Sequence, residues 1–119
     1  MSPGSPSNSS AAQAPAPAAD LRLGLMFFSS EATAPGRDAY RLVLDGARIA
    51  DETGLAAVWL PERHFDRFGG LFPNPSVIAA ALAATARRIS LRAGSVVLPL
   101  HHPVRVVEEW SVVDNLSDG

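Results

Sequence analysis

The chain has 119 residues, 47% of them hydrophobic and 18% charged, with a formal net charge of -2 at pH 7. This balance predicts a packed globular domain and excludes a fibrous or wholly disordered chain, and the scattered basic residues give no footprint for nucleic acid or an anionic membrane. The chain contains no cysteine, which excludes disulfides and thiolate metal sites and fits a reducing cytoplasm. No apolar run approaches the roughly 18 residues of a membrane span. We therefore expect a soluble cytoplasmic protein.

The first two predicted elements follow a polar N-terminal segment. Residues 1–19, "MSPGSPSNSSAAQAPAPAA", contain too little apolar bulk to fold and predict a disordered tail or linker. "LRLGLMFF" (21–28) predicts a strand buried on both faces. A helix follows over about 38–53, with Asp38 as the N-cap and Gly54 at its end.

The next strand and helix have clear boundaries. "LAAVWLP" (55–61) predicts a second buried strand. Asn74 as N-cap and Pro75 in the first turn predict the start of a helix that runs to the cations Arg87 and Arg88.

The last predicted pair is a strand over 89–100, with Gly94 and Ser95 in its interior, and a helix that starts at Pro103. Strands that alternate with helices predict a parallel α/β sheet, whose crossovers are right-handed. Three such units are too few for a closed barrel, which needs about 250 residues. We expect residues 20–119 to be a truncated part, about three β/α units, of a (β/α)8 TIM barrel.

Polar side chains concentrate where the strands end, which is the side where α/β folds place their chemistry. The richest stretch, "ERHFDRFGG", follows the second strand. His64 suits proton transfer near neutral pH, Arg63 suits the binding of an anion, and Glu62 lies beside them. The alternative is a salt-bridged loop that only stabilises this edge.

The adjacent histidines His101 and His102 point in opposite directions at a strand end, so both cannot face one site. His102 precedes a proline and is expected to cap the last helix. A metal site from Glu62, His64 and His101 is the alternative, but the spacing of these residues matches no metal motif, and we expect no metal. Gly94 and Ser95 would let a flat ligand approach the backbone, although a core bulge is the other interpretation.

The segments "GLMFFSS", "AAVWLPERHF", "NPSV", "GSVVLP" and "HPVR", in this order, closely resemble the N-terminal part of the bacterial luciferase-like flavin-dependent monooxygenases. The resemblance covers about residues 21–119, and the subgroup most similar is the one found in natural-product biosynthesis. It implies a (β/α)8 barrel and an enzyme that uses reduced FMN and O2 to oxygenate an organic substrate, which is sometimes bound to a carrier protein. It also implies a flavin reductase as partner, and relatives often form homodimers.

The resemblance further implies roles for individual residues. Glu62 and His64 match the family's "EHHF" motif, and Arg63 replaces its first histidine, so His64 becomes the residue expected to transfer protons. Gly94 and Ser95 fall where the family has a non-prolyl cis peptide against the flavin. Met26 and Phe27 are expected to pack against the flavin, with core packing as the alternative.

Two other functions stay open at this point. Related barrels use the deazaflavin F420 for hydride transfer. A non-catalytic partial barrel could instead bind a protein partner, with the Ser/Pro/Ala tail as its tether.

Overall fold

A computed structural model describes residues 20–28, 36–65 and 71–119. The predicted tail over 1–19 lies outside these residues, as do 29–35 and 66–70 in the loops after the first two strands. The elements in chain order are β1 (Gly24–Met26), the 3-10 turn η1 (Gly36–Tyr40), α1 (Arg41–Thr53), β2 (Ala57–Leu60), α2 (Pro75–Ala83), β3 (Ser90–Ala93), the 3-10 turn η2 (Leu98–Leu100) and α3 (Pro103–Ser117). No helix in these ranges is long and apolar enough to cross a membrane.

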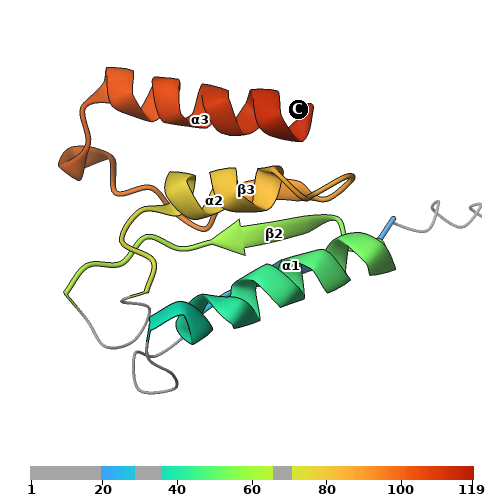
Figure 1. The fold of residues 1–119 in the computed structure, drawn as a ribbon. Helices are drawn as coiled ribbons and strands as arrows, with labels where there is room; N and C mark the ends of the chain where they lie inside the picture. The colour runs from blue at the N-terminus through green and yellow to red at the C-terminus, as the bar shows by residue number, and fades with distance from the viewer. Residues whose placement is uncertain (1–19, 29–35, 66–70) are drawn as a thin grey trace, which may run out of the picture.

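The three strands form one parallel sheet in the order β1-β2-β3, with Leu25, Val58 and Leu91 in register. Both crossovers place their helices, α1 and α2, on the same face of the sheet, and α3 packs beside α2 (Figure 1). The predicted order of strands and helices and the parallel α/β class are therefore confirmed.

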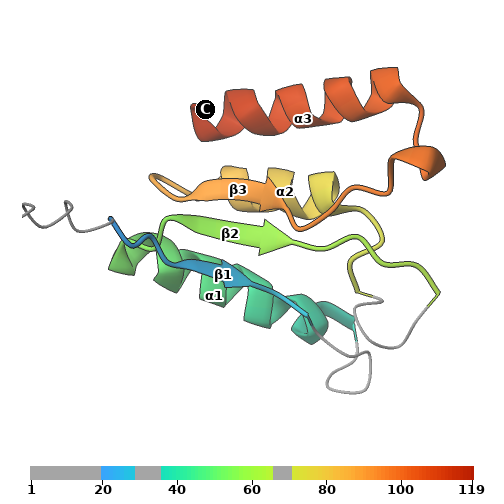
Figure 2. The ribbon, with the colours of Figure 1, turned by 180° about the vertical axis from the view of Figure 1, so that it is seen from behind.

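The core lies between the sheet and its helices. Val58 and Leu60 of β2 are fully buried there, against residues such as Val43 of α1 and Leu82 of α2. Among the helices that the structure describes, none covers the other face of the sheet, which lies toward the viewer in Figure 2. Alternate residues point to that face. The prediction that the first strand is buried on both faces is therefore wrong, since Met26 is 44% exposed. The second strand, predicted as buried, leaves Trp59 36% exposed on the same face.

Helix ends follow the predicted capping residues at three positions. The Asn74 side chain accepts hydrogen bonds from the second and third N–H groups of α2, and His102 accepts one from Val104 N at 3.3 Å. Gly54 ends α1 in the left-handed conformation, with a φ of 81°. Asp38 is not the N-cap of α1, because the chain enters that helix through η1 and Tyr40 occupies the cap position without a side-chain hydrogen bond.

Two predicted boundaries move inward. Helix α2 ends at Ala83, well before Arg87 and Arg88, because the Asp51 carboxylate binds the backbone there and leads it into β3. Strand β3 ends at Ala93, so Gly94 follows the strand rather than lying in its interior, although Gly94 N still donates to Leu60 O.

Candidate active site

A cleft of about 530 Å³ lies at the edge of the sheet where the carboxyl ends of the strands meet. Parallel strands bring the segments that follow them to one edge, so residues distant in sequence become neighbours. The lining residues are Phe28, Pro61, Glu62, Arg63, His64, Gly94, Ser95 and Val97. Glu62, Arg63, His64, Gly94 and Ser95 were predicted as site residues, and the structure brings them together.

Glu62 is the buried centre of the cleft wall, and its side chain is fully enclosed. Its Oε2 accepts a hydrogen bond from Val97 N at 2.7 Å. Its Oε1 lies 2.7 Å from His64 Nε2 and 2.6 Å from His101 Nε2. One carboxylate therefore joins the segment after β2 to the segment after β3.

This environment favours the charged form of Glu62. Burial raises the pKa of Glu62, but the hydrogen bonds from His64, Val97 N and His101 outweigh it and hold the pKa below the ordinary value of 4.5. The carboxylate is then ionised at neutral pH and can only accept hydrogen bonds. Each imidazole must carry its proton on Nε2 to make the contact, which leaves Nδ1 as the acceptor of a neutral ring.

His64 and Arg63 supply the other ionisable groups of the cleft. The His64 side chain is 25% exposed, so its ring is held by Glu62 and still reaches the cleft. Arg63 is anchored through its backbone, where its N–H donates to Phe72 O at 2.9 Å. The site thus combines a buried anion, a guanidinium and an imidazole that can exchange a proton.

Gly94 lies where a side chain would crowd the sheet. A Cβ there would lie 2.9 Å from Met26 Cε and 3.2 Å from Leu60 O. The resemblance implies a cis peptide at Gly94-Ser95, but every described peptide bond is trans, and this expectation is wrong for the structure. A trans bond is the lower-energy form for a non-prolyl peptide by about 2.5–4 kcal/mol.

The residues at and just after the end of β1 point alternately to the two faces of the sheet. Phe27 is 6% exposed and packs in the core toward Gly46 of α1, which is the core role left open in the sequence analysis. Met26 lies on the uncovered face, against Gly94. Phe28, which the sequence analysis did not select, lines the cleft instead. The alternation of side chains along a strand was the available signal, since it places Phe28 on the same side as Met26.

His101 is the other residue that sequence reasoning missed, except within the metal alternative. Its contact with Glu62 depends on η2, which turns the chain back after β3, and no local pattern reveals that turn. Among the residues that the structure describes, no group of three His, Cys, Asp or Glu side chains could hold a metal ion. The two histidines bind the carboxylate instead.

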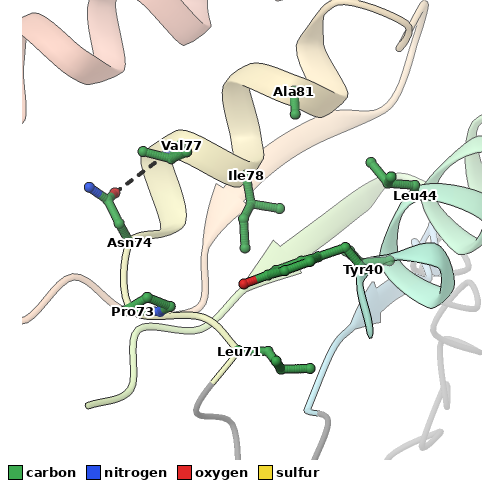
Figure 3. Close-up of a pocket in the computed structure, with 9 residues that line it drawn as sticks. Tyr40, Leu44, Leu71, Pro73, Asn74, Val77, Ile78 and Ala81 are labelled. Atoms are coloured by element: carbon green, nitrogen blue, oxygen red, sulfur yellow. Dashed lines mark hydrogen bonds between the residues drawn. The ribbon is translucent and has the colours of Figure 1, made fainter. Parts of the chain in front are cut away.

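A second cavity of about 310 Å³ lies on the helix side, between α1 and α2. Figure 3 shows the Tyr40 ring reaching toward Ile78, with Leu71 and Leu44 around it. Apart from Tyr40, its polar lining residue is Asn74, which is used for the helix cap. The chemistry-bearing side chains are in the cleft at the sheet edge, and we assign the candidate active site there.

Residues 21–119 match the protein family described as luciferase-like monooxygenase. The chain is similar to the alkanal monooxygenase alpha chain of Photorhabdus luminescens, with 43% identity over 72 residues that make up 60% of this chain and 20% of the relative. The comparison covers only a fifth of that protein's length.

Solved structures of larger proteins share the fold. Monooxygenase RslO1 from Streptomyces bottropensis superimposes with a TM-score of 0.78 and 31% identity, over 83% of this chain and 31% of that one. The oxygenating constituent of 3,6-diketocamphane monooxygenase from Pseudomonas putida, in complex with FMN, gives a TM-score of 0.75 at 21% identity, over 82% of this chain and 27% of that one. The predicted relation to part of a luciferase-like barrel is therefore confirmed.

Proposed function

Because the chain belongs to the luciferase-like monooxygenase family, we propose that it contributes the flavin-facing wall of an enzyme that uses reduced FMN and O2 to oxygenate an organic substrate. The observation that carries this proposal is the buried Glu62 carboxylate, which holds His64 at the edge of an open cleft beside Gly94. A salt-bridged loop that only stabilised the sheet edge would not need an adjoining cleft.

The residues of the cleft fit a flat aromatic cofactor. Gly94 adds no side chain to the cleft wall, and a Cβ there would press on Met26 Cε and Leu60 O. Phe28, 45% exposed, offers an apolar ring, and Arg63 offers a charge to an anionic group. Reduced FMN, when bound, would supply the electrons for activation of oxygen. We propose Gly94, Ser95 and Met26 as residues that flank it.

The chain's own groups would prepare and protect this chemistry. The ionised Glu62 holds the Nε2–H of His64, so Nδ1 is the atom that can take or return a proton in the cleft. The Arg63 guanidinium would stabilise negative charge that develops on oxygen. Pro61 and Val97 provide the apolar part of the cleft wall.

We further propose that a separate reductase supplies the reduced flavin and that the substrate is an intermediate of natural-product biosynthesis. The name "oxygenating constituent", carried by a protein of the same fold, supports a division between two components. The relatives reported above are monooxygenases, and none of them favours deazaflavin hydride transfer or a non-catalytic binding module.

The test is an anaerobic titration of the full chain with reduced FMN, in which binding is monitored by tryptophan fluorescence. Trp59 lies in register with Met26 on the uncovered face, so bound flavin should quench it. We expect saturable quenching that is lost in Trp59→Phe but kept in Trp110→Phe, because Trp110 packs against the core on the helix side. A linear, non-saturable response would contradict the proposal, and tighter binding of reduced F420 would favour the deazaflavin alternative.

A further inference from the structure

We propose that His101 is a positioning residue for His64, and that it acts through the carboxylate the two histidines share. The effect of His101 on catalysis rests on the proposed function. The contacts by which His101 positions His64 lie within this chain and do not depend on that function. His101 lies at the end of the segment after β3, and His64 lies in the loop after β2. They meet at Oε1 of Glu62, at 2.6 Å and 2.7 Å.

The carboxylate is fixed at both oxygens from one segment. Val97 N donates to Oε2 at 2.7 Å, and His101 binds Oε1. These two donors flank η2, whose own N–H groups bond back within the turn, so the segment can hold both oxygens at once. Two donors from this one segment, one on each oxygen, restrain the carboxylate plane more tightly than Val97 N alone would after the loss of His101.

The orientation of His64 follows from that plane. The His64 ring is held by the hydrogen bond from its Nε2 to Oε1 of Glu62. If the Glu62 carboxylate rotated, its Oε1 would move away from His64 Nε2. The His64 ring could then turn, and its Nδ1 would not keep one orientation toward the cleft. Among the described residues that line the cleft, Arg63 also carries an ionisable side chain, and its backbone N–H donates to Phe72 O.

The neighbouring histidine provides a matched control. His102 differs from His101 by one position, but its ring caps α3 through Val104 N, whereas the His101 ring binds Glu62. Asparagine is a good N-cap residue, so His102→Asn should keep the helix start. This variant separates a specific effect of His101 from a general disturbance of the segment.

The experiment measures the His64 ring by nitrogen-15 NMR of the full chain, without flavin, in His101→Gln, His101→Leu and His102→Asn. In the parent chain we expect a bonded Nε2–H proton on His64. His101→Leu removes the His101 donor to Glu62. We then expect the His64 Nε2–H proton to exchange with water about tenfold faster, which corresponds to the free energy of one hydrogen bond to an ion. His101→Gln keeps an N–H donor and should restore slow exchange. His102→Asn should match the parent.

Unchanged exchange in a His101→Leu chain with native circular dichroism would overturn the proposal, and so would equal acceleration in His102→Asn. If His101→Leu does not fold, His101→Phe takes its place, because it also removes the donor to Oε1 but keeps a flat ring of similar size, and the same two outcomes decide. Failure of the proposed function is a separate result, because it would appear as absent binding of reduced FMN while the His64 proton behaves as described.

Discussion

At the scale of single residues, Glu62 carries a buried charge that three donors from two loops satisfy. Glu62→Gln keeps the size but offers one acceptor oxygen in place of two, so a buried donor loses its partner. We expect a loss of about 1–3 kcal/mol in the free energy of unfolding, measured by urea denaturation at pH 7.

The same substitution has a pH signature. The pKa of Glu62 is below 4.5 in the folded chain, so its contribution to stability is fully present above that ordinary value and is lost as the pH falls through the lowered pKa. The difference in unfolding free energy between the parent and Glu62→Gln should therefore shrink below pH 4.5. A difference that stays constant down to acid unfolding would show that the charge is not responsible.

Gly94 offers a second test at residue scale, because the space for a Cβ is taken by Met26 Cε and the Leu60 carbonyl. We expect Gly94→Ala to cost about 1–3 kcal/mol of stability, typical of overpacking, and to weaken reduced-FMN binding. Met26→Ala removes the closer contact but leaves the carbonyl, so the double variant should recover only part of the loss. Full recovery, or no loss in Gly94→Ala, would contradict this account of the crowding.

At the scale of elements, Asp51 connects the end of α1 to the start of β3. Its carboxylate accepts hydrogen bonds from the backbone N–H groups of Arg87, Arg88 and Ile89, at 2.8–3.1 Å. Burial raises the pKa of Asp51, but these bonds outweigh it and lower the pKa below 3.8. Asp51→Asn should therefore destabilise the chain by about 1–3 kcal/mol in urea unfolding at pH 7.

The matched control is Asp45→Asn, the same substitution at an exposed position of the same helix. Its effect should stay within about 0.5 kcal/mol, as is usual for surface substitutions. Equal effects of the two substitutions would mean that helix charge, and not the link to β3, accounts for the result.

The N-cap of α2 gives the other prediction at this scale. The Asn74 side chain accepts from Ser76 N at 3.1 Å and from Val77 N at 3.4 Å. Asn74→Ala should cost about 1 kcal/mol of unfolding free energy, whereas Asn74→Ser should keep most of the stability, because serine caps almost as well. Equal losses in both variants would argue against the cap as the cause.

The sequence predicted these elements unevenly, for physical reasons. Asn74 and Gly54 were found because a cap is encoded within a few residues of the helix end. The early end of α2 was missed because it depends on Asp51, more than thirty residues away from the backbone it binds. Contacts of that range leave no local pattern.

At the scale of the whole molecule, the parallel order of strands could be predicted from the alternation with helices, and that order alone placed Glu62, His64 and Gly94 at one edge. The exposure of Met26 and Trp59 could not be predicted, because an apolar run does not show which face of the sheet the helices will cover. In this structure α1 and α2 cover the same face of the sheet. On the other face, Arg92 Cζ lies 5.2 Å from the centroid of the Trp59 ring.

The central claim is that the cleft at the sheet edge, and not the apolar cavity between α1 and α2, receives reduced flavin. The most direct test is an anaerobic amide NMR titration of the full chain with reduced FMN. The account predicts saturable shifts at Arg63, Gly94 and Val97, with Val77 and Ala81 of the apolar cavity unchanged. Shifts confined to Val77 and Ala81, or no saturable shift at any of these amides, would contradict it.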